Sequence, residues 1–416
     1  MTITLQEVFA TSFDDYASTR RLPIKHYKAA ESIITCRTPA QGGHVQRCPD
    51  GHEQHIQYHS CRHRSCPQCN SFVKEQWLQR QRERLLPMDH YHAIFTLPHE
   101  FHGLWRFNQR QMTQLLFKSV SETLLTLCRD RKYMGGVPGM MLTLHSWGRN
   151  LSLHPHIHCL ISGGGLDHEG RWREVKNSFL LPSRVVRKVY RGKMLALIRQ
   201  GLDAGELTWP PGDREVPMDH LLSRVTRKHW HVQIQPPYRH GKGVMMYLAR
   251  YVKGGPLSSR KLLSVDAGSV SFRYQDHRDG QNKQLQLEKG HFLGRLLEHV
   301  PEPGQNVVRH YGLYGHRAKA KRQQVREALG LSLEQDAQPI SWETFLQKLG
   351  DKTKGCCKVC GKSLVMGVRV IKNSFYREQV VRNVQQGAQR GNRNVGMVRT
   401  GALQGKPIFF WPGDSG

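Results

Sequence analysis

Three histidines alternate within an apolar run in the stretch Leu153-His154-Pro155-His156-Ile157-His158-Cys159-Leu160-Ile161. Alternate side chains of a β-strand point to the same face, so His154, His156 and His158 are expected to lie together. Neutral imidazole is a common ligand of divalent metals. The pattern therefore predicts a preformed metal site on a strand. The alternative is a strand whose histidines form hydrogen bonds in a polar interior.

The segments around the histidine strand predict a central sheet with helices, which is a mixed α+β fold. The strand itself is expected to end at the glycine run 163–165 and to form a hairpin with a strand over residues 140–147. A second hairpin is predicted from residues 269–274 and 283–288 around Asp279-Gly280. Further strands are expected over residues 90–97 and 229–235, and helices over residues 107–128, 184–199 and 244–253.

Helical patterns also flank this region. The first 35 residues contain two periodic segments, residues 71–86 predict a charged helix, and residues 317–329 predict a basic one. The last thirty or so residues are rich in Gly, Asn, Gln and Arg, and we expect much of them to be disordered. We divide the chain into N-terminal helices with a cysteine-rich module (1–86), a catalytic domain (87–300) and a basic C-terminal region (301–416).

The composition points to a polyanionic partner. Lys and Arg total 62 against 33 for Asp and Glu, which gives a net charge of +29. Nucleic acid is the first expectation for such a charge, and an anionic membrane surface is the weaker alternative. The sequence shows neither a transmembrane run nor a signal peptide, so we expect a cytoplasmic protein. Its ten cysteines should then be mostly reduced, and their clustering indicates metal binding.

Two tyrosines lie at helical spacing in Tyr247-Leu248-Ala249-Arg250-Tyr251, so both phenols should share one helix face. Tyrosine can attack a phosphodiester as a covalent nucleophile, and a metal that neutralises the phosphate makes this feasible near neutral pH. Alone, such a pair would indicate packing. Together with the histidine strand and the positive charge, it predicts catalysis by Tyr247 and Tyr251. Arg250 and Lys253 are predicted to hold phosphates, or else to form a solvated basic face.

A zinc site is predicted between residues 36 and 70. Cys66 and Cys69 form one C-x-x-C pair, Cys48 and His52 form a second pair, and thirteen residues separate the two pairs. Two such pairs suit a tetrahedral structural Zn²⁺ site. Unligated buried thiols are the alternative, but little apolar sequence surrounds them. Other candidate ligands are Cys61, Cys36 and His44.

The zinc module is expected to present basic residues to DNA, among them Arg62 and Arg64. A further cysteine group, Cys356-Cys357-Lys358-Val359-Cys360, is similar to half of a zinc knuckle and has no clear second half downstream. The sequence alone leaves open whether this group is a remnant or a working site.

The motifs together resemble the HUH endonuclease superfamily, and within it the rolling-circle transposases of the insertion sequence 91 family. The resemblance spans most of residues 36–315. It rests on the histidine motif and the tyrosine pair with Val252-Lys253, and on three further segments. These are Tyr58-His59-Ser60-Cys61-Arg62-His63-Arg64-Ser65-Cys66-Pro67-Gln68-Cys69, Phe272-Arg273-Tyr274-Gln275-Asp276-His277-Arg278 and Arg309-His310-Tyr311-Gly312-Leu313.

The resemblance implies a ferredoxin-like catalytic domain with a central antiparallel sheet and the histidine strand at its centre. It also implies Mg²⁺ or Mn²⁺ at His156 and His158. His154 is expected to be the third ligand, with His145 on the neighbouring strand as its competitor. One departure concerns the zinc module, because relatives often have C-x-x-C where this chain has Cys48 to His52.

The implied activity is cleavage and rejoining of single-stranded DNA at the ends of a mobile element. One tyrosine would form a 5′-phosphotyrosine and free a 3′-OH that primes rolling-circle replication, and the second would cut the other end or the target. The implied setting is a bacterial nucleoid. The alternatives are a plasmid replication initiator or relaxase with the same chemistry, a non-catalytic zinc-dependent DNA-binding regulator, and a metallohydrolase that activates water.

Overall fold

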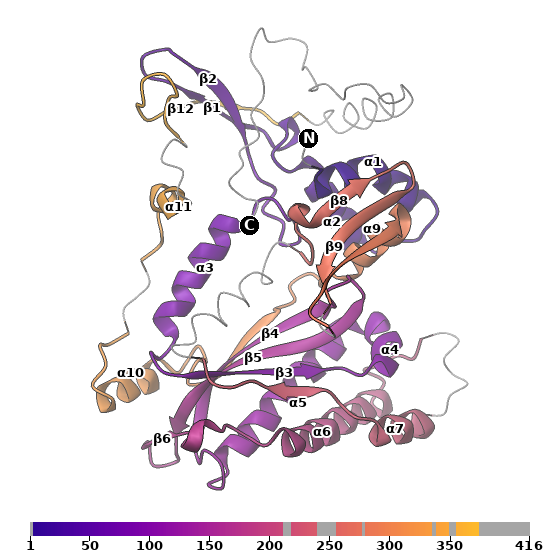
Figure 1. Ribbon diagram of the computed structural model, residues 1–416, viewed down its shortest axis with the longest axis vertical. Helices are drawn as coiled ribbons and strands as arrows, with labels where there is room; N and C mark the ends of the chain where they lie inside the picture. Colours follow the sequence, from indigo (N-terminus) through magenta and orange to yellow (C-terminus); the bar gives the residue numbers. More distant parts are fainter. Residues whose placement is uncertain are drawn as a thin grey trace.

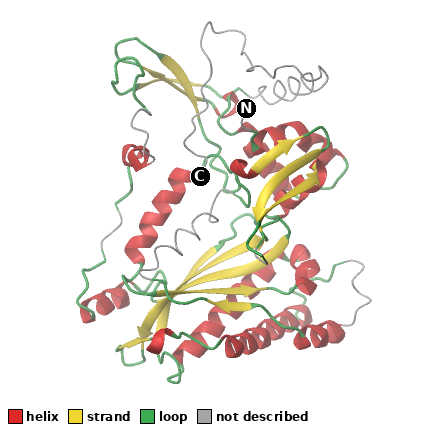
Figure 2. Ribbon diagram, in the orientation of Figure 1, coloured by secondary structure: helices red, strands yellow, loops and turns green. Residues whose placement is uncertain are grey.

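The structure is a computed structural model, and it describes residues 3–210, 218–238, 255–276, 279–334, 338–348 and 355–373. A twisted central sheet lies between a layer of helices on one face and the N-terminal and C-terminal regions on the other (Figures 1 and 2). The expected helix over 244–253 and the C-terminal tail lie outside the described residues. Among the described residues, no helix has the length and apolar character needed to cross a membrane.

The central sheet has the order β11-β4-β5-β3-β7, and β6 pairs with β5. Its pairings are all antiparallel, which confirms the expected α+β class with a central antiparallel sheet. The histidine strand, β5, lies between β4 and β3. The strands are β3 (His90–Thr96), β4 (Val137–Trp147), β5 (Leu153–Leu166), β6 (Trp172–Glu174), β7 (Val232–Ile234) and β11 (Val308–Gly312).

The histidine strand runs further than predicted, through the glycine run to Leu166. The glycines permit this because both neighbouring strands approach the backbone closely. A Cβ at Gly164 would overlap the Trp172 ring of β6, and a Cβ at Gly165 would lie 2.5 Å from the Val137 carbonyl carbon of β4. The run is thus a close-packed part of the strand and not its end.

Four helices cover one face of the sheet, and the two longest lie below it in Figure 1. Their buried residues, such as Phe117 and Tyr190, pack against Leu142 and Ile157 of the sheet in the largest hydrophobic core. The amphipathic patterns predicted the two long helices, and the structure confirms them. The helices are α4 (His102–Phe107), α5 (Gln109–Arg129), α6 (Ser183–Asp203) and α7 (Met218–Arg227).

A second core joins the two N-terminal helices to a hairpin and a helix that come much later in the chain. The first helix begins at a capping box, in which the Thr4 side chain accepts from the Glu7 amide and the Glu7 carboxylate accepts from the Thr4 amide. Phe9 packs in this core with Phe272 and Phe292. The elements are α1 (Leu5–Ser18), α2 (Ile24–Thr35), β8 (Leu262–Val265), β9 (Ser269–Gln275), β10 (Asn282–Glu288) and α9 (Lys289–Glu298).

The helices α3 (Ser71–Arg84) and α10 (Lys319–Ala328) contribute to a core on the opposite face of the central sheet, and β1, β2 and β12 form a separate small sheet at the top of Figure 1. Leu78 and Val325 pack there against Met141 and Leu160, so this third core contains residues from all three predicted parts of the chain. The division at residues 86 and 300 is therefore not matched by separate cores. The elements are β1 (Gly43–Arg47), β2 (Gln54–Tyr58), α3 (Ser71–Arg84), α10 (Lys319–Ala328), α11 (Trp342–Lys348) and β12 (Val365–Val370).

Candidate metal centres

The histidines of β5 lie on the sheet face that points away from α5 and α6. Ile157 and Cys159 belong to the helix-side core, whereas Leu160 belongs to the core on the other face. Strand alternation therefore places His156 and His158 opposite the helix layer. Both side chains are buried, at 9% and 3% exposure.

Hydrogen bonds orient these two imidazoles toward one point. The Nδ1 atom of His156 lies 2.6 Å from the His154 carbonyl oxygen, so it carries the proton and donates. The Nδ1 atom of His158 lies 2.8 Å from Nε2 of His92, a residue of β3. The Nε2 atoms of His156 and His158 then face each other at 3.0 Å. With Nδ1 used in this way, both Nε2 atoms can present lone pairs to a cation.

His145 of β4 completes the cluster. It lies directly across from His156 in the strand pairing, and its ring centroid is 4.3 Å from that of His158. The ligand atoms of His145, His156 and His158 all lie within 4.8 Å of one another. Burial holds the pKa of His145 and His158 well below 6.5 and lowers that of His156 to about 3. The three imidazoles are therefore neutral near pH 7, which is the form that binds metals.

His154 is not part of this three-histidine group, in contrast to the expectation that it would supply the third ligand. Its ring lies beside His156, with 5.0 Å between the ring centroids. The physical reason lies in strand geometry. His154 is four residues from His158 along β5, a rise of roughly 13 Å, whereas His145 pairs with His156 and its ring centroid lies 4.3 Å from that of His158. Metal binding by His154 stays a prediction.

The cysteines of the N-terminal module fall into two clusters, and this differs from the predicted single site. Cys66 and Cys69 lie with Cys61 and Cys36, all within 4.8 Å of one another, whereas Cys48 and His52 lie elsewhere. The strands β1 and β2 explain the separation, because Cys48 and His52 occupy the turn that joins them. His44, another candidate, instead contacts His59, with 2.8 Å between Nδ1 and Nε2.

The all-cysteine cluster lies in the core of the N-terminal helices. Cys36 follows the last turn of α2, and Cys66 and Cys69 are buried beside it. The Asn70 side chain stabilises the C-x-x-C loop by donating to the Cys66 carbonyl at 2.7 Å. Four cysteine sulfurs without an open position are typical of a structural zinc site.

The second cluster draws on both ends of the described chain. Cys48 and His52 lie with Cys357 and Cys360 from the C-terminal segment, again within 4.8 Å of one another. Cys357 and Cys360 therefore lie beside a pair that comes far upstream in the sequence, and not downstream of them.

Comparison with known proteins gives the family. A family model described as a transposase zinc-binding domain matches residues 8–97, and one described as "Putative transposase" matches residues 139–322. The protein is 31% identical to "Putative transposase y4qJ" of Sinorhizobium fredii, over 82% of this chain and 88% of that one. The chain belongs to the insertion sequence 91 family of transposases.

Two further similarities are weaker. The transposase for insertion sequence element IS801 of Pseudomonas savastanoi pv. phaseolicola is 27% identical, over 80% of this chain and 81% of that one. The metal-bound structure of the conjugative relaxase TrwC with oriT DNA covers 38% of this chain and 71% of its own, at 12% identity and a TM-score of 0.22. A structural likeness at that score supports no conclusion about fold or function.

The family match bears on the cysteine clusters and on the histidines. The zinc-binding model includes all four residues of the all-cysteine cluster, which agrees with Zn²⁺ as the metal of this transposase. The second model includes the whole histidine cluster. Tyr247, Tyr251, Arg250 and Lys253 lie outside the described residues, so their predicted roles stay predictions.

The two predicted DNA contacts of the zinc module have different surroundings. Arg62 is exposed, in a loop, with φ of 55°. Arg64 is partly buried, and its guanidinium donates to the Gln305 carbonyl at 2.7 Å. Arg64 therefore links the zinc module to the loop before β11.

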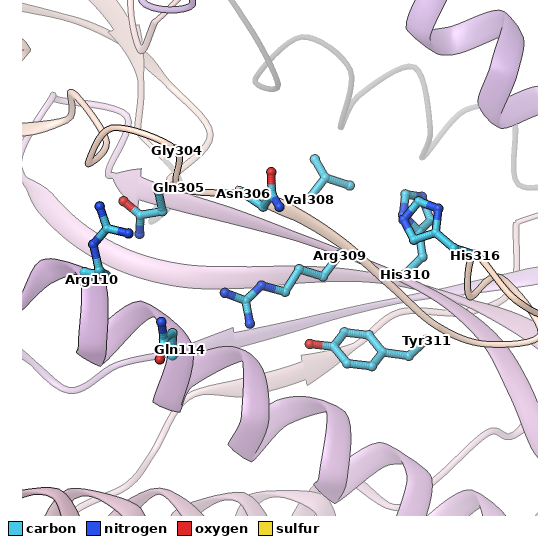
Figure 3. A pocket seen from close by; sticks show the side chains of 10 residues that line it. All are labelled: Arg110, Gln114, Gly304, Gln305, Asn306, Val308, Arg309, His310, Tyr311 and His316. Atoms are coloured by element: carbon cyan, nitrogen blue, oxygen red, sulfur yellow. The ribbon is translucent and has the colours of Figure 1, made fainter.

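A polar cavity of about 350 Å³ lies at the β11 edge of the central sheet (Figure 3). Arg309 and Tyr311 point toward Arg110 and Gln114 of α5, and Arg309 also stacks on the Phe117 ring at 4.4 Å. Arg309 and Tyr311 belong to a segment that only the family resemblance singles out in the sequence. The two guanidinium groups give this cavity the charge that a phosphate group prefers.

Proposed function

We propose that this transposase cleaves and rejoins single-stranded DNA at the ends of its element through 5′-phosphotyrosine intermediates. The observation that carries the proposal is the convergence of three neutral imidazoles from paired strands, in a chain of a transposase family. The net charge of +29 supports DNA as the partner.

The histidine cluster fits a catalytic divalent metal. His145, His156 and His158 would hold it by ring nitrogens, and the strand pairing fixes those nitrogens before any ligand arrives. Three nitrogen ligands leave positions for phosphate oxygens and water. When bound there, Mn²⁺ or Mg²⁺ would neutralise the oxygens of a scissile phosphate and polarise its phosphorus. Because imidazole suits transition metals better than Mg²⁺, we expect Mn²⁺ to bind more tightly.

The proposed covalent chemistry belongs to Tyr247 and Tyr251. The phenolic oxygen of one tyrosine forms a bond to phosphorus while the bond from phosphorus to the 3′ oxygen breaks. The leaving oxygen gains a proton to become a 3′-OH, and the phenol proton is lost to solvent. Rejoining reverses this, because a 3′-OH attacks the phosphotyrosine and displaces the tyrosine. Two tyrosines allow two such adducts, one for each end that is cut.

A nicking assay on single-stranded oligonucleotides tests the proposal. Wild-type protein with Mn²⁺ should yield cleaved DNA and a covalent protein–DNA adduct that survives denaturing electrophoresis. The double variant Tyr247→Phe/Tyr251→Phe should yield neither. Tyr27→Phe is the matched control, since Tyr27 is 42% exposed on α2 and should be dispensable.

Other outcomes separate the alternatives. Adducts that persist in the double variant would refute the tyrosine assignment. Cleavage by the wild type without any adduct would indicate a metallohydrolase that activates water. Binding without cleavage, over all metals tested, would favour a non-catalytic regulator.

A further inference from the structure

The C-terminal segment 355–373 forms a tight cysteine turn. The Gly361 amide donates to the Cys357 carbonyl at 2.8 Å, and the Cys357 amide donates to the Lys362 carbonyl at the same distance. Gly361 has φ of 72°, which favours glycine at this position. The Val359 amide lies 3.4 Å from the Cys357 sulfur and points a donor at it. This turn presents the sulfurs of Cys357 and Cys360 on one side.

The turn between β1 and β2 presents the complementary half. The Gly51 amide donates to the Cys48 carbonyl at 3.1 Å, which closes the loop that carries Cys48 and His52. The Cys48 sulfur lies 3.6 Å from Nδ1 of His52 and 3.5 Å from the Cys360 sulfur, 312 residues away in sequence. Neither distance is that of a covalent bond, and all the cysteines are free thiols.

Other contacts hold the two halves together around these side chains. The Lys358 amide donates to the Glu53 carboxylate at 2.7 Å, and the Lys362 ammonium lies 2.9 Å from the Asp50 carboxylate. Strand β12 pairs with β1, so the C-terminal segment extends the β1–β2 hairpin into a three-stranded sheet. In Figure 1 this three-stranded sheet lies at the end of the molecule away from the central sheet.

We propose that Cys48, His52, Cys357 and Cys360 bind a Zn²⁺ ion of their own, which fastens the C-terminal segment to the zinc module. Three thiolates and one imidazole form a donor set that Zn²⁺ prefers, and four protein ligands leave no position open for catalysis. The site therefore differs from the all-cysteine cluster in its ligands and from the histidine cluster in its role.

The packing of β12 shows why a metal is needed there. Its apolar side chains are turned to solvent, with Met366 at 66% and Val368 at 77% exposure, so burial of apolar surface does little to hold this strand. The segment before it is anchored on α3 by the Phe72–Trp342 ring contact and by Lys348 with Glu75. A zinc ion would fix residues 355–373 to the turn between β1 and β2.

Zinc content tests the proposal directly. In a His156→Ala/His158→Ala background, which removes the histidine cluster, the purified protein should contain two Zn²⁺ per chain, one for each cysteine cluster. Adding Cys357→Ser and Cys360→Ser should lower this to one, and limited proteolysis should then cut within residues 355–373. Cys356→Ser is the matched control, because Cys356 lies outside the cluster, and it should leave two. Retention of two ions after loss of Cys357 and Cys360 would overturn the proposal.

A second variant keeps the test decisive if the serine variants fail to fold. His52→Cys should retain two ions and change only the ligands. X-ray absorption at the zinc edge should change from seven sulfurs and one nitrogen for the two ions to sulfur alone. An unchanged spectrum in a folded, two-zinc His52→Cys protein would show that His52 is not a ligand and would refute the site as proposed.

Discussion

The histidine cluster differs in construction from the split cluster, which is formed by Cys48, His52, Cys357 and Cys360. Two of the three histidines come from one strand and the third from its hairpin partner, and all three are buried in the central sheet. The halves of the split cluster are 312 residues apart, and His52 in it is exposed. On a single hairpin, strand periodicity determines which ligands lie together. Ligands from two distant segments of the chain come together only after the chain has folded.

The difference indicates that the histidine and cysteine clusters have different roles. The histidines are placed for chemistry on a sheet that large hydrophobic cores already stabilise. The all-cysteine cluster lies within the core of the N-terminal helices, and the second cysteine cluster lies beside β12, whose apolar side chains are exposed, so both are placed to hold segments of the fold together.

The largest effect is expected from Cys66→Ser in the all-cysteine cluster. Loss of this buried ligand should release the ion and destabilise the protein by more than about 4 kcal/mol, because structural zinc binding contributes directly to folding. Thermal unfolding should shift strongly downward. Cys128→Ala is the control, since Cys128 is equally buried but belongs to no cluster, and it should cost about 1 kcal/mol. Equal shifts for both variants would show that Cys66 stabilises the protein by packing and not by zinc binding.

The histidine cluster should show the reverse pattern. His156→Ala should reduce adduct formation about 1000-fold, as expected for several kcal/mol of lost transition-state stabilisation, while the unfolding temperature changes little. His145→Ala should match it, and His154→Ala should stay within about tenfold of wild type. A larger loss from His154→Ala than from His145→Ala would restore His154 as the third ligand.

A smaller effect is expected at His92, which positions His158 and is not itself in the cluster. His92→Phe removes the acceptor 2.8 Å from Nδ1 of His158, and should weaken Mn²⁺ binding about 10- to 100-fold. His92→Gln keeps an acceptor and should recover most of the affinity. Titration followed by electron paramagnetic resonance of Mn²⁺ measures both. Equal losses for the two variants would point to packing and not to orientation.

The smallest effects are expected at two arginines of the zinc module, Arg62 and Arg64, whose surroundings differ. Arg62→Ala should lower the salt dependence of DNA binding by about one phosphate contact and leave stability unchanged. Arg64→Ala should lower the stability and leave the salt dependence of DNA binding unchanged, because the Arg64 guanidinium donates to the Gln305 carbonyl. Binding isotherms at several salt concentrations, together with melting curves, distinguish the two. A reduced salt slope for Arg64→Ala alone would reverse the assignment.

The parts of the fold that local patterns determine were predictable. Alternation predicted the histidine strand and its hairpin, and Asp279-Gly280 predicted the turn between β9 and β10, which the pairing confirms. The family motifs predicted the transposase family. The prediction that the glycine run ends the histidine strand was wrong, because the sequence of one segment does not show how closely neighbouring strands approach it.

The site was predictable only where its members are close in sequence. The choice between His145 and His154 depended on the register of β4 against β5, which a single strand does not reveal. The partition of the cysteines depended on β12 pairing with β1, a contact between the two ends of the chain. The sequence spacing predicted one site for Cys48, His52, Cys66 and Cys69, because spacing reflects distance along the chain. In the folded chain the two pairs belong to different clusters.

Mass spectrometry of the trapped adduct tests the central proposal most directly. Wild-type protein, incubated with Mn²⁺ and single-stranded DNA from an element end, would be digested with protease and nuclease and its modified peptide sequenced. The proposed chemistry predicts a nucleotide attached through its 5′ phosphate to Tyr247 or Tyr251. A nucleotide on any other residue, or complete cleavage with no modified peptide, would contradict it.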